Sequence, residues 1–137
     1  MKMKINILSL VVSLGFAKVQ AGEIVIIGNS NVPKMDITMV QKIYTGKVIS
    51  VEGINVTPVA VKAGMSERNR FLQNFMNEDE EKYTAYWTVR RYIGKGTPPN
   101  ELDSTTDVIR YVKQTSGAVG YIDETQLEAD TNVITRK

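Results

Sequence analysis

Short apolar runs alternate along the chain with longer segments in which apolar residues recur every three or four positions. Five runs rich in β-branched residues predict strands, at residues 23–27, 47–50, 57–61, 117–122 and 133–134. Residues 28–31 form a turn after the first run, and Gly53 lies in a turn between the second and third. The composition of residues 94–99 predicts a loop.

Apolar residues at helical spacing predict four helices, at residues 37–44, 67–76, 82–92 and after Ser104. We expect Asp36 and Ser66 to cap the first two helices, and Gly46 to end the first. The acidic run 78–81 lies where the first turn of the third helix favours negative charge. Ser104 begins a capping-box-like sequence for the fourth helix.

This alternation of strands and helices predicts an α/β layered domain, and neither an internal repeat nor a second domain is visible. The third helix carries Tyr83, Tyr86 and Trp87, which we interpret as core residues. The alternative is that these rings form a ligand or partner surface.

The first 21 residues have the pattern of a secretory signal peptide. Lys2 and Lys4 form a basic start, residues 5–16 are mostly apolar, and Val19 and Ala21 place small residues at a cleavage site. An apolar run of about 12 residues is short for a membrane anchor, and the chain has no cysteine to carry a lipid. The alternative is a buried N-terminal helix. We expect cleavage after Ala21, a periplasmic location, and no membrane insertion of the single domain at 22–137.

Export changes the charge balance. The whole chain has 17 basic and 15 acidic residues, a net charge of +2. Cleavage after Ala21 removes three lysines and no acid, which leaves 14 basic and 15 acidic residues and a net charge of −1. A nucleic-acid partner is therefore not expected, because no excess of basic residues remains.

Enzyme chemistry finds little support in the sequence. The chain contains no histidine and no cysteine, so it lacks the usual general base, a thiolate nucleophile and the commonest transition-metal ligand. Ser66 has Asn69 and not lysine three positions later. Residues 94–97 resemble a phosphate loop but lack its first glycine. We predict a protein that is not an enzyme and has no catalytic residues, no metal site and no cofactor.

The remaining functional signal is a candidate anion site where the second helix begins. Free N–H groups and the helix dipole attract phosphate or carboxylate there. Gly64, Ser66 and Arg68, with Lys62 nearby, form the predicted site. Glu67 opposes it, because its carboxylate competes for the same N–H groups.

A second basic patch ends the third helix and consists of Arg90, Arg91 and Lys95. Its position near glycines is compatible with anion binding. The alternative is a solvated helix end, where cations lie favourably beside the C-terminal dipole.

Several motifs resemble those of the substrate-binding protein of phosphate ABC transporters. Residues 43–48 resemble its IFxGK(I/V) segment, Gly64 with Arg68 and Phe71 its GSGTRxxF helix start, and residues 113–122 its KxTPGAIGYV strand. Short single-domain relatives also carry YW…GxGxPP, which matches Tyr86-Trp87 and residues 94–99 here. The resemblance implies one periplasmic-binding-protein-type lobe, similar to the family's second lobe, with a central mixed β-sheet flanked by helices.

The resemblance does not extend to the family's phosphate ligands. Met65 and Glu67 stand where the family has its serine and threonine ligands. Ala63 takes the place of the acidic proton acceptor and Val61 that of an arginine. The resemblance therefore implies the fold more strongly than it implies a phosphate site.

Two functions remain open at this point. One is an exported solute-binding-type domain that holds phosphate or another small oxyanion weakly. The other is an interaction module of the cell envelope that docks on a membrane sensor, a porin or another assembly, or forms a homodimer.

Overall fold

The computed structural model describes Gly15 and residues 22–137, so the predicted signal peptide lies outside the described residues apart from Gly15. Its strands are β1 (Ile24–Gly28), β2 (Ser50–Val51), β3 (Ile54–Asn55), β4 (Thr57–Val61), β5 (Asn100–Leu102), β6 (Ala118–Asp123) and β7 (Asn132–Arg136). Its helices are α1 (Ile37–Tyr44), α2 (Ser66–Phe71), η1 (Leu72–Met76), α3 (Glu80–Tyr92), α4 (Thr105–Gln114) and η2 (Glu124–Gln126).

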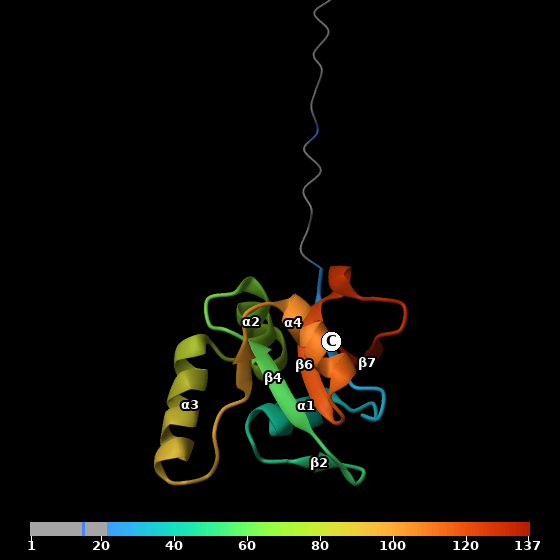
Figure 1. Cartoon of the computed structure of the whole chain (residues 1–137). Coiled ribbons are helices and arrows are strands. Elements are labelled where there is room, and N and C mark those ends of the chain that lie inside the picture. Colours follow the sequence, from blue (N-terminus) through green and yellow to red (C-terminus); the bar gives the residue numbers. More distant parts are fainter. Residues whose placement is uncertain (1–14, 16–21) are drawn as a thin grey trace, which may run out of the picture.

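Five of the strands form one mixed sheet in the order β5-β4-β6-β1-β7 (Figure 1). The strand β4 runs parallel to both β5 and β6, whereas β1 runs antiparallel to β6 and β7. The short strands β2 and β3 pair separately. The predicted fold, a mixed sheet flanked by helices, is confirmed.

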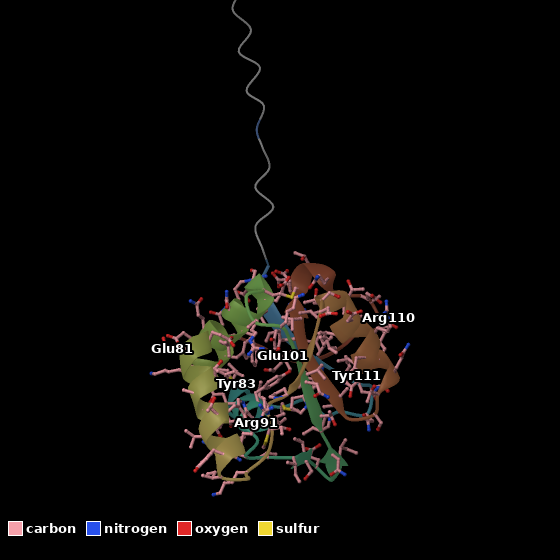
Figure 2. The ribbon with its side chains drawn as sticks, turned by 60° about the vertical axis from the view of Figure 1, so that its left-hand side comes forward. Glu81, Tyr83, Arg91, Glu101, Arg110 and Tyr111 are labelled. Carbon is pink, nitrogen blue, oxygen red and sulfur yellow. The ribbon has the colours of Figure 1, made fainter. Side chains whose placement is uncertain are left out.

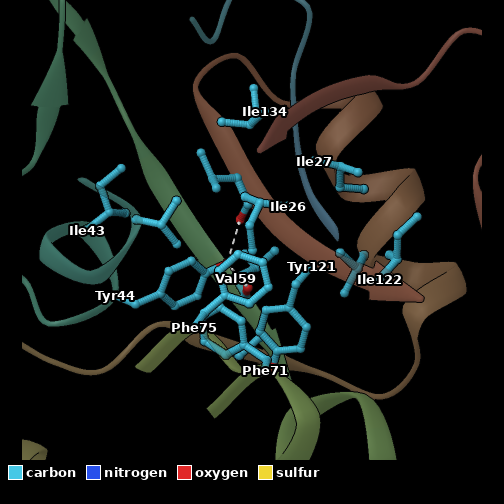
Figure 3. Packing of buried hydrophobic residues seen from close by; sticks show 14 of the residues in the cluster. Ile26, Ile27, Ile43, Tyr44, Val59, Phe71, Phe75, Tyr121, Ile122 and Ile134 are labelled. Atoms are coloured by element: carbon cyan, nitrogen blue, oxygen red, sulfur yellow. Dashed lines mark hydrogen bonds between the residues drawn. The ribbon is translucent and has the colours of Figure 1, made fainter. Parts of the chain in front are cut away.

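The core lies on both faces of β6, because successive side chains of a strand point to opposite sides. Gly120 lies against Val108 of α4 on one face. On the other face, the Tyr121 ring stacks on Phe71 with centroids 4.2 Å apart, and Tyr44 packs on Phe71 at 4.6 Å (Figure 3). The buried Tyr44 hydroxyl donates to the Val59 carbonyl at 2.8 Å, so this polar group is satisfied inside the core.

Two of the three predicted cap positions are confirmed. The Asp36 carboxylate accepts a hydrogen bond from the Met39 N–H at the start of α1. Ser104 accepts from the Asp107 N–H at the start of α4. The third, Ser66, is wrong: it lies inside α2, the N-cap is Met65, and the Ser66 hydroxyl accepts instead from Arg70 Nε.

Other sequence predictions also need correction. Residues 47–49 are not a strand, because the N–H groups of Lys47 and Val48 both donate to the Lys42 carbonyl and hold the chain against the end of α1. The second predicted helix changes at Leu72 into the π-helix η1, where Gln41 of α1 donates to the Phe75 carbonyl at 2.7 Å. The short strand β5 was not predicted.

The helix α3 lies at one flank of the molecule and packs against the end of α1 (Figure 1). Tyr83 and Trp87 are buried, as predicted for core residues, and Tyr86 is partly buried. The loop predicted at residues 94–99 follows α3 and leads into β5. Among the described residues, no helix is long and apolar enough to cross a membrane.

Candidate functional site

A cavity of about 350 Å³ lies against α3, beside Ala63, which follows the carboxyl end of β4, and Glu101 of β5. Ligands of α/β proteins commonly bind near the carboxyl ends of parallel strands. Tyr83, Arg91 and Glu101 lie around this region in Figure 2. The cavity is lined by Ala63, Arg68, Glu80, Tyr83, Thr84, Trp87, Thr88, Arg91, Pro98 and Glu101.

Arg68 is the charged centre of this cavity, and only 6% of the residue is exposed. Its Nε and Nη2 donate to the two carboxylate oxygens of Glu80, each at 2.7 Å. Its Nη1 donates to Glu101 Oε1 at 2.6 Å and to the Val61 carbonyl at 3.1 Å. All three guanidinium nitrogens therefore already have acceptors within the chain.

The two carboxylates also offset the positive charge of the cavity, because Glu80 and Glu101 balance Arg68 and Arg91 in its lining. Burial lowers the pKa of Arg68, but the hydrogen bonds and charges of Glu80 and Glu101 outweigh it and raise the pKa above its ordinary value. Arg68 is thus permanently charged and paired. An incoming phosphate would meet carboxylates before it met the guanidinium.

Three separate segments build this cluster. Arg68 comes from α2 and Glu80 from the first turn of α3. Glu101 lies on β5, where parallel pairing places it opposite Ala60 of β4. Sequence reasoning assigned Glu80 only to a helix start and missed Glu101. No local pattern could have found the contact, since Arg68 and Glu101 are 33 positions apart.

The other residues of the predicted anion site lie around Arg68 but at the surface. The Lys62 side chain is 58% exposed, with its Nζ 3.9 Å from Asp103. Gly64 is exposed and has a φ of 92°, which glycine adopts without strain. Ser66 is exposed, and its hydroxyl accepts from Arg70 at 3.1 Å. The structure therefore brings three of the predicted residues together at the surface and places the fourth, Arg68, in the interior.

The second basic patch divides into three different environments. The Arg90 guanidinium lies over the rings of Tyr86 and Trp87, 5.5 and 5.7 Å from their centroids, where it stabilises the packing of α3. Arg91 lines the cavity together with Arg68, a proximity that the sequence did not predict. Lys95 is exposed in the loop after α3.

In the aromatic wall of the cavity, the Tyr83 hydroxyl serves the fold, whereas the buried Trp87 Nε1 has no hydrogen-bond partner among the described residues. The Tyr83 hydroxyl donates to the Tyr44 carbonyl at 2.8 Å, and burial raises the pKa of Tyr83 to about 12. Tyr83 is therefore a neutral phenol at ordinary pH. Residues 22–137 contain no group of three acidic side chains placed to hold a metal ion.

The fold is similar to one lobe of proteins of the periplasmic binding protein type. Across 82% of its length, the chain superposes on a phosphate ABC transporter substrate-binding protein from Clostridium perfringens, with bound phosphate, at a TM-score of 0.63 and 18% identity. It is also similar to an ABC-type phosphate transport receptor from Vibrio cholerae (TM-score 0.57, 15% identity) and to PstS from Borrelia burgdorferi (0.61, 13%).

The chain spans less than half of these structures, namely 44%, 45% and 46% of their lengths. Its sequence matches no protein-family model and no curated protein. The likeness thus establishes the fold, and the structural resemblance predicted from the motifs is confirmed.

Proposed function

We propose that this chain is an exported, periplasmic domain of the solute-binding-protein type that docks on another protein and does not carry phosphate. The partner is an envelope protein, such as a membrane sensor or a porin, or a second copy of the chain. The proposal includes removal of residues 1–21 and assigns no catalytic role.

The main support for this proposal is that Arg68 is already hydrogen-bonded to other residues of the chain. Four of the five N–H donors of this buried guanidinium already bind two carboxylates and a carbonyl, which leaves a single Nη2 N–H for a ligand. Opening it to phosphate would exchange its bonds to Glu80 or Glu101 for bonds to the anion, so phosphate has to compete with two carboxylates already in place. Because the Glu80 and Glu101 side chains are 32% and 49% exposed, solvent screening makes the loss of one pair smaller than the loss of a fully buried pair.

A second candidate is weak binding of a small oxyanion at Lys62, Gly64 and Ser66, with Arg68 beneath them. The observation in its favour is that Met65, the N-cap of α2, makes no side-chain hydrogen bond to the helix. The first N–H groups of α2 are thus without a side-chain cap. In this candidate, Arg90, Arg91 and Lys95 contribute only long-range attraction.

Calorimetry with phosphate and sulfate separates the two candidates. The docking proposal predicts no saturable heat from the wild type at about 1 mM anion, where a binding free energy near −4 kcal/mol would become visible. Saturable heat that is lost in Lys62→Ala and strengthened in Glu67→Thr would contradict the docking proposal and support the oxyanion site. Lys42→Ala, at an exposed position of α1, is the matched control for Lys62→Ala.

A further inference from the structure

The cavity against α3 contains charged atoms that the fold leaves unused. Arg91, in the last turn of α3, lines the cavity and takes part in no ion pair among the described residues. Glu101 of β5 binds Arg68 through Oε1, so its second carboxylate oxygen is available, and its side chain is 49% exposed. An unpaired cation and a partly available anion therefore line the same space from two different elements.

The lining as a whole is electrically balanced. Arg68 and Arg91 supply two positive charges, and Glu80 and Glu101 supply two negative charges. A lone anion is repelled by the carboxylates, and a lone cation is repelled by the guanidinium groups. A ligand that carries both charges matches such a lining when each of its charges lies beside an opposite one.

The two available groups are too far apart to bind each other. No ion pair joins Arg91 to Glu101, so their charged atoms are more than 4.0 Å apart. The side of α3 that lines the cavity extends from Glu80 to Arg91, which is about 16 Å of helix. A ligand that reaches both Arg91 and Glu101 therefore needs a spacer between its own charges.

Apolar groups make up much of the remaining lining. Tyr83 and Trp87 contribute aromatic rings from α3, and Ala63 and Pro98 contribute aliphatic groups from the segments that follow β4 and α3. The cavity volume of about 350 Å³ lies within the range of small-molecule sites, roughly 300–1,000 Å³. A short hydrocarbon spacer suits this lining, because its burial removes apolar surface from water.

We propose that the cavity binds a small zwitterion whose ammonium and carboxylate groups are separated by a short apolar spacer, as in an ω-amino acid or the two ends of a dipeptide. The ammonium group binds the available oxygen of Glu101, the carboxylate binds the Arg91 guanidinium, and the spacer lies along Trp87. The bonds of Arg68 stay as they are. This inference goes beyond docking on a protein, because it assigns a small-molecule ligand to the cavity.

The fluorescence of Trp87 measures binding directly, because Trp87 lines the cavity and is the only tryptophan of the chain. We expect 6-aminohexanoate to change its emission with a dissociation constant of about 10 µM to 1 mM, since ion pairs with partly exposed groups are weak. Glycine has a single carbon between its charges, and hexylamine and hexanoate each lack one charge. All three should bind at least about threefold more weakly than 6-aminohexanoate.

Leucyl-leucine distinguishes the two sources of this chemistry. If it binds more tightly than 6-aminohexanoate, the ligand is a peptide with two free ends. If 6-aminohexanoate binds more tightly, the ligand is an ω-amino acid.

Two substitutions test the charged contacts separately. Arg91→Gln should weaken 6-aminohexanoate at least about threefold but not hexylamine, which has no carboxylate. Glu101→Gln should weaken 6-aminohexanoate to a similar extent but not hexanoate, which has no ammonium group. Circular dichroism verifies that each variant is folded, above all Glu101→Gln, because Glu101 also pairs with Arg68.

Arg110→Gln and Glu81→Gln are the matched controls, because both residues are exposed and neither lines the cavity. Arg110 lies on α4, far from Arg91 (Figure 2), and Glu81 lies in the first turn of α3. Both variants should bind 6-aminohexanoate as the wild type does.

Three results would overturn the inference. The first is that neither 6-aminohexanoate nor leucyl-leucine gives a change of emission or a saturable heat at about 10 mM. The second is equal affinity for 6-aminohexanoate, hexylamine and hexanoate, and the third is unchanged binding in Arg91→Gln. None of these results depends on phosphate or on a protein partner, so this inference and the proposed function fail in different experiments.

Discussion

Single residues show how this fold reuses a charged side chain. Arg68 occupies the position that the motif resemblance suggests for a ligand contact, yet its bonds join α2, α3 and β5. The same guanidinium that could bind an anion in an open site here connects three elements. Whether an arginine is a ligand residue depends on the carboxylates around it, and these come from distant positions in the sequence.

The small residues of β6 have a structural role. A Cβ added at Gly120 would lie 2.5 Å from Val108 Cγ1 of α4. We expect Gly120→Val to lower the free energy of unfolding by about 1–3 kcal/mol, because the extra bulk overpacks this contact. Urea denaturation measures the change, with Thr106→Val, at an exposed position of α4, as control. A Gly120→Val variant as stable as the wild type would contradict this assignment.

Asp123 should make stability depend on pH. Burial raises its pKa, but hydrogen bonds from Thr125 and the Arg70 guanidinium, 2.7 Å away, outweigh burial and hold the pKa below its usual range. A carboxylate whose pKa is lowered by folding stabilises the protein above its unfolded pKa, near 4, and loses that contribution as the pH falls through the folded pKa.

Asp123→Asn should therefore lower the free energy of unfolding by about 1–3 kcal/mol at pH 7, and by progressively less as the pH falls below about 4. Urea denaturation across this pH range tests the sign of the effect. A difference between wild type and variant that stays constant from pH 7 to pH 3 would show that the Asp123 charge does not contribute.

At the scale of elements, the helix starts were predictable where a cap is local. Asp36 and Ser104 accept hydrogen bonds from N–H groups three positions later, so a short stretch of sequence contains both partners. Ser66 has the same chemistry but is bound by Arg70 inside the helix. The strand β5 was missed because its strand partner, β4, lies some 40 positions earlier in the chain.

The helix α3, which begins at Glu80, forms one wall of the cavity. The Asp79 carboxylate accepts from the Lys82 N–H at 2.9 Å and caps this helix. Asp79→Ala should cost about 1 kcal/mol of stability, because it leaves that N–H without its partner. Thermal or urea unfolding measures the loss. Asp103→Ala removes an exposed acid that caps no helix, and an equal loss in both variants would refute the capping role.

For the whole molecule, the alternating apolar pattern was sufficient to predict the α/β layers, because each strand and helix carries its own periodicity. The mixed sheet and its likeness to a binding-protein lobe followed from the motif resemblance. The candidate site could not be predicted to the same depth. Arg68 was identified, but Glu101 was missed, because the pairing of Arg68 with Glu80 and Glu101 depends on how α3 and β5 pack around α2.

The same packing determines what the molecule offers to its surroundings. Carboxylates face the cavity where a phosphate carrier would need free donors. Exposed apolar residues instead lie near the C-terminal end of α3, at Val89, Tyr92 and Ile93. Together these two features favour docking on a protein over binding of an anion, and each can be tested by a separate experiment.

The most direct test of the central claim observes the Arg68 Nε–H group by NMR during a phosphate titration. The Arg68→Lys variant assigns the signal by its loss. We predict a resolved, slowly exchanging Nε–H resonance that does not move with phosphate at about 10 mM, ten times a millimolar dissociation constant. A signal that exchanges rapidly, or that shifts in a saturable manner as phosphate is added, would show that Arg68 is open to the anion and would contradict the account.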